Sequence, residues 1–365
     1  MSPLEDIIRT RIAENGPITV AEFMETALGH PEHGYYMKDD PFGATGDFIT
    51  APEISQVFGE LIGLWSAVTW QQIGGAGKIT LVECGPGRGT LMRDLLRAAQ
   101  SVPAFAATIE IHLVETSAAM RDRQRATLAG YAPHWHDTLD TVPPGPTILI
   151  ANEFLDALPV RQLVMTGRGW AERRVALDDG GLVFSPGEIA ADADRLVPAA
   201  GKDAPPGAIF ETCPTAGKFA DSLCRRFSSA PGAALLIDYG HAESNLGDTL
   251  QAVRRHAYAN VLSDPGESDI TAHVDFDALA RTLRAGGAQT MGPIAQAAFL
   301  NGLGIAERTD TLARAAAPEA AARLRSGTER LTAPGQMGDL FKVMVASHAE
   351  SPKLAGFETW VNPEC

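Results

Sequence analysis

One stretch of the sequence, residues 79–90, restricts the fold more than any other. It reads Ile-Thr-Leu-Val-Glu-Cys-Gly-Pro-Gly-Arg-Gly-Thr, an apolar run that ends in an acid and continues with three glycines at alternate positions. The amphipathic run that follows predicts a helix, so the stretch is predicted to form a strand, a tight turn and a helix. Glycine lets the backbone turn sharply and approach a ligand closely. The turn also presents the N-terminus of the helix to that ligand.

The spacing of the glycines distinguishes this turn from two common nucleotide-binding loops. A dinucleotide fingerprint requires glycine at position 90, where the chain has Thr90, which disfavours an NAD-dependent oxidoreductase. A P-loop ends in Gly-Lys-Ser/Thr, and this turn does not. The pattern Glu-x-Gly-x-Gly-x-Gly resembles the S-adenosylmethionine (SAM) loop of class I methyltransferases. On the loop alone, that interpretation and an ordinary strand-to-helix turn of another α/β domain are about level.

Short apolar runs alternate with amphipathic ones from residue 78 onward. This alternation predicts an α/β fold with a doubly wound sheet. The predicted strands are 79–84, 109–114, 147–152, 233–238 and 340–346, and the predicted helices are 90–100, 117–129, 153–158 and 275–285. Two stretches interrupt the alternation, an inserted hairpin region at 160–230 and a region that ends in Ala/Arg-rich helices at 241–335.

The first 50 residues are predicted to form two short helices and then a long loop over 29–50. That loop contains Tyr35, Tyr36 and Asp47. Loops of this length inside a compact domain often serve as lids or binding loops, and a surface connection is the alternative. Thr50 and Glu53 have the spacing of a capping box at the start of the next helix.

Acids follow several predicted strands, at the sheet edge where ligands bind in open α/β folds. Glu115 follows the second strand and could accept both hydrogen bonds from a ribose diol, while Thr116 and Ser117 after it fit a helix cap. Asp137 lies at the next candidate strand end. It could bind an adenine amine, or it could be an exposed loop acid.

The fourth strand leads directly into Asn152 and Glu153. Glu153 and Asp156 are three residues apart, so on a helix they would share one face. Capping by Asn152 and Glu153 is the alternative interpretation. The density of polar groups at the predicted ligand edge favours a functional role.

Composition excludes several function classes. The net charge of −15 and the pI near 5.0 argue against sequence-independent nucleic-acid binding, and they permit a basic protein partner. The four cysteines form no C-x-x-C pair, and no histidine pair is supported by further ligands, so no metal site is expected. No run approaches the roughly 18 apolar residues of a membrane span, so no membrane insertion is expected. The N-terminus lacks signal-peptide and transit-peptide features, which favours a cytoplasmic protein.

Several motifs together resemble the MidA family of SAM-dependent protein arginine methyltransferases, whose mitochondrial members assist assembly of respiratory complex I. The similar segments span residues 35–345 approximately and are specific in combination. They are Phe48–Ser55, Glu83–Thr90, His112–Glu115, Ala151–Pro159, Asp238–Gly240, Asp269–Phe276 and Met337–Val343. The absence of a transit peptide favours a bacterial cytoplasmic homologue.

The resemblance implies a class I SAM-methyltransferase (Rossmann-like) fold, SAM as cofactor, and methyl transfer to an arginine of a complex I core subunit. It implies an N-terminal helical and lid region at 1–75, a SAM-binding core at 76–240 that includes the hairpin region, a helical insertion at 241–335, and a C-terminal strand and tail at 336–365. The implied site has two acids against the guanidinium, a set of donor-binding residues and a set of lid or substrate residues. The two acids are Glu153 and Asp156. The donor-binding residues are Glu83, Gly85, Gly87, Gly89, Glu115, Thr116, Asp137 and Asn152. The lid or substrate residues are Tyr35, Tyr36, Asp47, Thr50 and Glu53.

Two other function classes stay open. One is a non-catalytic assembly or chaperone protein that retains the methyltransferase fold, and the other is a small-molecule methyltransferase. The insertions could serve a large substrate or a homodimer. The sequence leaves the acceptor, the number of methyl groups and the roles of Arg88, His256 and His273 undetermined.

Overall fold

The computed structural model describes residues 2–38, 50–75 and 77–361. The chain forms two compact units. The first unit comprises Met1–Phe48, Asp156–Lys218 and Glu243–Asp275, and the second comprises Ile49–Leu155, Phe219–Ala242 and Phe276–Cys365. Each compact unit combines distant parts of the chain. The division into four consecutive segments that the sequence suggests stays a prediction.

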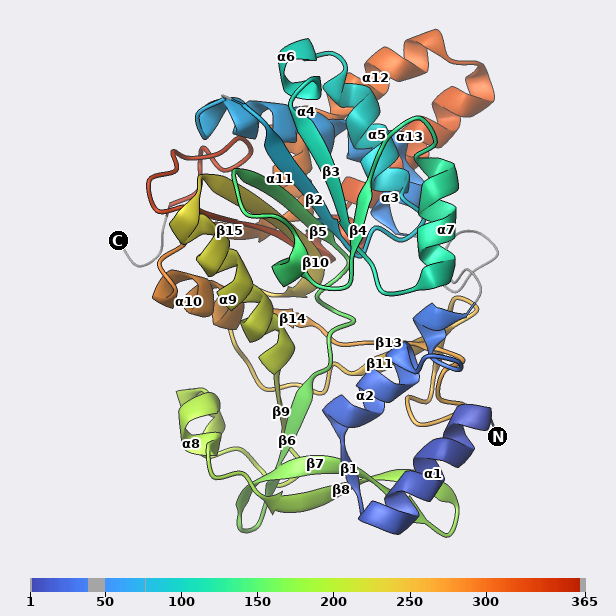
Figure 1. The fold of residues 1–365 in the computed structure, drawn as a ribbon. Helices are drawn as coiled ribbons and strands as arrows, with labels where there is room; N and C mark the ends of the chain where they lie inside the picture. Colours follow the sequence, from blue (N-terminus) through green and yellow to red (C-terminus); the bar gives the residue numbers. More distant parts are fainter. Residues whose placement is uncertain (1, 39–49, 76, 362–365) are drawn as a thin grey trace. The chain divides into compact units, whose positions relative to one another are not determined.

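The second unit contains a central sheet, drawn in Figure 1. Its strands are β2 (Ile79–Cys84), β3 (Ile109–Val114), β4 (His134–His136), β5 (Thr147–Asn152), β10 (Gly232–His241), β15 (Gln289–Ala295) and β16 (Phe341–Ser347). The spatial order is β15-β16-β10-β5-β2-β3-β4, with β16 antiparallel to both its neighbours and the other pairs parallel. The direction of strand addition reverses at β2, and such a switch point is where open α/β sheets bind ligands. The fold is therefore the class I SAM-methyltransferase fold that the resemblance implied.

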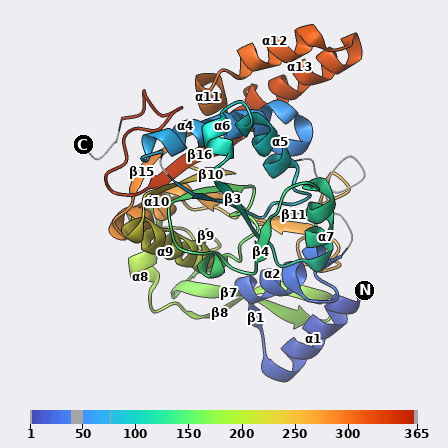
Figure 2. The same ribbon diagram turned by 45° about the horizontal axis from the view of Figure 1, so that its top comes forward.

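The central strands form because their residues are apolar on both faces. Every residue of β2 and of β5 is buried, as expected of parallel strands covered by helices. The helices of this unit are α3 (Ala51–Ile54), α4 (Gln56–Gln72), α5 (Thr90–Ala99), α6 (Pro103–Ala106), α7 (Ala118–Thr127), α10 (Phe276–Ala285), α11 (Gln296–Gly302), α12 (Ile305–Ala315), α13 (Pro318–Thr332) and α14 (Met337–Leu340), with most of α9 (Pro214–Ser229) and the short 3-10 helix η2 (Leu139–Thr141). In Figures 1 and 2, α12 and α13 lie side by side.

Helices α4 and α5 pack unusually closely. A Cβ added at Gly63 would lie 2.5 Å from the carbonyl oxygen of Leu95. Glycine at position 63 therefore permits the close approach of α4 to the middle of α5.

All five predicted strands are confirmed, but the predicted helical insertion also contains β15. The sequence Met291-Gly292-Pro293-Ile294 inside that strand predicts a break. The strand tolerates it because β15 is at the sheet edge, and its register with β16 shifts between Met291 and Ile294.

The first unit contains the two predicted N-terminal helices, α1 (Pro3–Asn15) and α2 (Val20–Gly29), which are separated at Gly16 with φ +83°. Its larger sheet has the order β1-β7-β6-β9, with β8 paired to β7. The bounds are β1 (Ile18–Thr19), β6 (Arg161–Thr166), β7 (Gly169–Asp178), β8 (Gly181–Ile189) and β9 (Ile209–Thr212), with the short helices η1 (Tyr35–Met37), α8 (Ala193–Leu196) and η3 (Ala199–Gly201). The predicted hairpin is β7 and β8. A second sheet has the order β12-β11-β13, formed by β11 (Gln251–Arg254), β12 (Ala257–Ala259) and β13 (Asp269–Thr271), and β14 (Val274–Asp275) follows it in the chain.

Candidate functional site

The glycine turn joins β2 to α5 as predicted. Gly85, Gly87 and Gly89 have φ values of +65°, +49° and +81°, in the left-handed region that glycine enters without a steric penalty. A Cβ added at Gly85 would lie 3.0 Å from Cδ2 of Phe154. The left-handed backbone at positions 85, 87 and 89 therefore favours glycine at each of them. At position 85 the contact with Phe154 also leaves little space for a Cβ atom.

Glu83 ends β2 with its side chain buried. Burial raises the pKa of its carboxyl to about 8, and a hydrogen bond from the backbone N–H of Met92 opposes this shift. Its Oε2 atom has no hydrogen-bond partner among the described residues. A buried oxygen without a partner next to a glycine turn fits a site whose remaining polar partner is a ligand.

Glu115 follows β3 and is held by two donors. Its Oε1 accepts from the backbone N–H of Ser117 at 2.8 Å, and its Oε2 accepts from Nε2 of Gln124 at 3.1 Å. Burial raises the pKa of Glu115, and these hydrogen bonds oppose the rise. A carboxylate can accept about four hydrogen bonds, so acceptor capacity remains for a diol. Thr116 beside it is exposed, and Ser117 caps α7 in place of Thr116.

Asp137 follows β4, and its side chain is 77% exposed and ion-paired with Arg121 at 2.6 Å. The same guanidinium donates through Nε to the carbonyl oxygen of Glu115 at 2.8 Å. Backbone pairing continues beyond the strands, because Glu115 N donates to the carbonyl oxygen of His136 at 2.9 Å. Asp137 and Glu115 are therefore connected through Arg121, and both proposed roles for Asp137 stay predictions.

Glu153, at the end of β5, has φ +51°. Its Oε1 accepts from the backbone N–H of Ala51 at 2.9 Å and from Nδ2 of Asn152 at 3.0 Å. Asn152 is buried, and its Oδ1 has no hydrogen-bond partner within the described chain. Two oriented polar groups, one with an unused acceptor, therefore lie at the strand end.

The predicted helix over 153–158 is wrong, since the described backbone there consists of bends and a turn. The left-handed conformation of Glu153 interrupts a right-handed helix at its first residue. Asp238 then accepts the backbone N–H groups of Phe154 and Leu155 at 3.1 Å and 2.9 Å, through its Oδ2. A carboxylate from β10 therefore satisfies the first two backbone donors after Glu153. Because residues 153–158 are not helical, Glu153 and Asp156 do not share a helix face.

The predicted capping box at Thr50 is also wrong, because Thr50 makes no side-chain capping hydrogen bond in the described part of the chain. Glu53 instead accepts from the hydroxyl of Thr90 at 2.5 Å and lies 3.7 Å from the guanidinium of Arg88. Helix α3 therefore holds the glycine turn at its far end. This contact also gives Arg88, which the sequence left unexplained, a carboxylate partner.

Among the described residues of the first unit, the predicted site residues are Tyr35, Tyr36 and Asp156. The two tyrosine rings pack edge to face with centroids 5.2 Å apart. The hydroxyl of Tyr36 donates to Oδ1 of Asp269 at 2.7 Å. Burial, with the nearby charges of Asp269 and Asp156, raises the pKa of Tyr36 well above its usual range. The structure therefore groups these residues with Asp269, which sequence reasoning did not select as a site residue; Asp47 lies outside the described residues.

Two further polar residues of the second unit were not selected from the sequence. Asp238 lies at the end of a predicted strand, where the sequence was too ambiguous to assign it a role. Gln124 lies in the middle of α7, where no motif marks it, yet it donates to Glu115 and to the carbonyl oxygen of Gly87.

His256 and His273 lie in the first unit. His256 has φ +61° between β11 and β12, and the backbone N–H of His273 donates to Thr249 Oγ1 at 2.9 Å.

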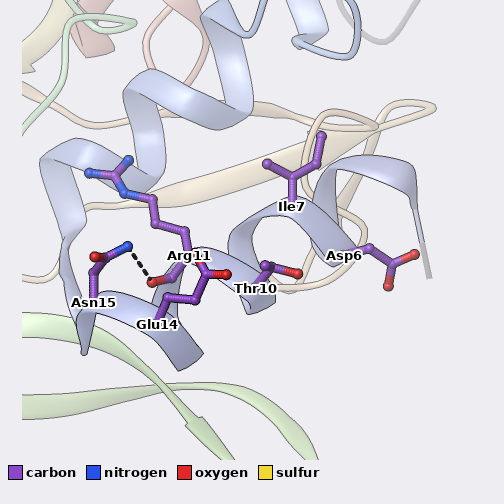
Figure 3. A pocket seen from close by; sticks show the side chains of 6 residues that line it. All are labelled: Asp6, Ile7, Thr10, Arg11, Glu14 and Asn15. Carbon is purple, nitrogen blue, oxygen red and sulfur yellow. Dashed lines mark hydrogen bonds between the residues drawn. The ribbon is translucent and has the colours of Figure 1, made fainter.

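A hollow along α1 is shown in Figure 3. Its lining does not include a predicted site residue; it consists of Asp6, Ile7, Thr10, Arg11, Glu14 and Asn15.

Across residues 2–38, 50–75 and 77–361, no group of three His, Cys, Asp or Glu side chains could hold a metal ion. In the same part of the chain, no helix is both long and apolar enough to cross a membrane.

Comparison with known proteins identifies similar chains along almost the whole length. Residues 61–294 match the model of a family described as "Putative S-adenosyl-L-methionine-dependent methyltransferase". The mitochondrial protein arginine methyltransferase NDUFAF7 of Mus musculus is 37% identical over 93% of this chain and 83% of its own, and that of Homo sapiens is 35% identical over 93% and 82%. A crystal structure from Burkholderia thailandensis with bound S-adenosyl-homocysteine has a TM-score of 0.86 and 31% identity, over 99% of this chain and 96% of its own.

Proposed function

Because the chain belongs to the MidA family of SAM-dependent methyltransferases, we propose that it is a protein arginine N-methyltransferase whose acceptor is a respiratory complex I core subunit. Its cofactor is S-adenosyl-L-methionine. The observation that supports arginine as acceptor is the 35–37% identity to protein arginine methyltransferases over 93% of the chain. The complex I subunit is the acceptor that the sequence motifs imply.

The residues around β2 and β3 fit the cofactor. Three left-handed glycines leave positions 85, 87 and 89 of the turn without Cβ atoms, and Glu83 and Asn152 each present a buried oxygen without a partner among the described residues. Bound SAM would supply an activated methyl group on a sulfonium centre. Glu115 would accept hydrogen bonds from the ribose hydroxyls, and Asp137 from the adenine amine. Glu83 would lie towards the methionine end.

The acceptor presents the larger chemical difficulty. The pKa of a guanidinium lies far above 7, so a neutral guanidinium at pH 7 would cost roughly 8 kcal/mol. Carboxylates lower this difficulty by orienting the guanidinium and offsetting charge as the methyl group arrives. Glu153 is held in one orientation by Ala51 and Asn152, and we assign it this role with Asp156 as the second acid. Alignment of the two reactants can contribute ~7–11 kcal/mol.

The proposed reaction is tested by labelling. Purified wild type and Glu153→Gln are incubated with methyl-labelled SAM and a soluble extract of the source cells, and labelled proteins are identified by mass spectrometry. We expect methylarginine on one protein with the wild type, and a loss of about a hundredfold or more with Glu153→Gln at near-normal SAM affinity. The exposed Glu319→Gln is the matched control and should label normally.

Three outcomes would contradict the proposal. Full labelling by Glu153→Gln would remove Glu153 from catalysis. Label only in the small-molecule fraction would indicate a small-molecule methyltransferase, and no label at all would indicate an assembly protein. Replacing the labelled arginine by lysine should abolish the signal.

A further inference from the structure

We propose that Gln124 is a positioning residue that holds Glu115 and the glycine turn in the arrangement that binds the ribose part of SAM, with Trp135 setting the orientation of its amide. The inference rests on the proposed placement of SAM at these two segments. It does not depend on which acceptor receives the methyl group.

Gln124 connects three strand ends from a single buried position. Its side chain is fully buried on α7. Its Nε2 atom donates to the carbonyl oxygen of Gly87 at 2.7 Å and to Oε2 of Glu115 at 3.1 Å, and its Oε1 atom accepts from Nε1 of Trp135 at 2.8 Å. Gly87 follows β2, Glu115 follows β3, and Trp135 lies within β4. One amide therefore ties the glycine turn to the carboxylate on the neighbouring strand.

The three partners permit only one orientation of the amide. The indole nitrogen of Trp135 can only donate, so the oxygen of Gln124 must face it. The amide NH₂ then faces the two oxygens of Gly87 and Glu115. A flipped amide would place its oxygen against both of these acceptors and its NH₂ against a donor. Trp135 thus selects the orientation in which Gln124 supports the carboxylate.

The contact also affects the charge of Glu115. Burial favours the neutral form of this carboxyl, whereas the hydrogen bond from Gln124 favours the charged form. A charged carboxylate can accept hydrogen bonds from two hydroxyls, while a protonated one presents a donor on one oxygen. Removal of the amide should therefore make ligand binding more sensitive to acid, an effect that a purely structural buried side chain would not have.

A second buried glutamine provides a matched comparison. Gln296 of α11 is also fully buried, donates to the carbonyl oxygen of Leu331 at 2.9 Å, and has an Oε1 atom without a partner in the described part of the chain. Gln296 therefore makes its hydrogen bond to the backbone of another helix and none to a described residue of the candidate site. Gln124 differs because both ends of its amide are engaged by residues of the candidate site.

The test compares S-adenosyl-homocysteine binding by calorimetry at about pH 8 and about pH 6 in wild type, Gln124→Met, Trp135→Phe and Gln296→Met. Because hydrogen bonds to charged groups are stronger than neutral ones, we expect Gln124→Met to weaken binding by about tenfold to a hundredfold at pH 8. The loss should be larger at pH 6. Trp135→Phe should show a smaller loss with the same pH trend, and Gln296→Met should lower the Tm while leaving Kd within about twofold.

Equal Kd values for Gln124→Met and wild type at both pH values would overturn the proposal, as would a loss that is the same at pH 8 and pH 6. If Gln124→Met does not fold, the pH trend of Trp135→Phe decides the question. Failure of arginine labelling by a wild type that binds S-adenosyl-homocysteine would contradict the proposed acceptor and leave the role of Gln124 intact.

Discussion

Glu83 illustrates how much the environment of one residue changes its chemistry. The carboxyl is buried, so burial raises its pKa to about 8, whereas the same group in an unfolded chain titrates near ~4.3. Between these values the folded state holds a proton that the unfolded state lacks. The free energy of unfolding therefore falls as pH rises through this window, by up to about 1.4 kcal/mol per pH unit.

Glu83→Gln should remove this contribution. We expect its urea midpoint to fall less than that of the wild type between about pH 5 and about pH 8, because glutamine does not titrate. Urea unfolding at several pH values measures the difference, and the exposed Glu319→Gln should retain the wild-type slope. Parallel curves for Glu83→Gln and the wild type would show that Glu83 is charged in the folded state at neutral pH.

At the scale of elements, the site depends on one strand-turn-helix unit held at both ends. At its start, Gly85 lies against Phe154 from the segment after β5. At its end, Thr90 and Arg88 contact Glu53 from α3. The same short helix contacts the end of β5 through the hydrogen bond from Ala51 to Glu153. The turn is therefore positioned by contacts from two other elements and not by its glycines alone.

Gly85→Ala tests this arrangement. Left-handed φ and the 3.0 Å approach of Phe154 should together destabilise the protein by about 1–3 kcal/mol and weaken S-adenosyl-homocysteine binding. Gly77→Ala is the control, because Gly77 has a similar φ of +75° with open space around its Cβ position. Thermal unfolding and calorimetry measure both effects. Equal stability and affinity in the two variants would show that the contact with Phe154 is unimportant.

At the scale of the whole molecule, the net charge of −15 should influence which protein acceptors are methylated. A negative field attracts basic partners, and salt screens it, with a Debye length of about 10 Å at 0.1 M and about 3 Å at 1 M.

We therefore expect kcat/KM for an arginine peptide with basic flanks to fall as salt rises from about 0.02 M to about 0.5 M. The same peptide with acidic flanks should show the opposite trend. A methyl-transfer assay at several ionic strengths measures both. Salt dependence of the same sign for the two peptides would show that the net charge does not steer the acceptor.

The sequence alone determined the class of fold and the position of the glycine turn. The predicted strands at 79–84, 109–114 and 147–152 agree with β2, β3 and β5, because short apolar runs between turn signals are typical of strands covered on both faces. The glycines at 85, 87 and 89 were likewise readable, since their spacing reflects a local backbone requirement that all three satisfy.

Only the tertiary structure decided which side chains meet. Asp238 binds the backbone after Glu153, Glu53 contacts the glycine turn in place of Thr50, and Gln124 joins Gly87 to Glu115. Each of these contacts joins residues that are between 9 and 84 positions apart in the chain. Sequence periodicity reports the local face of an element, whereas a hydrogen bond between elements depends on how the sheet places them, and no local pattern records that placement.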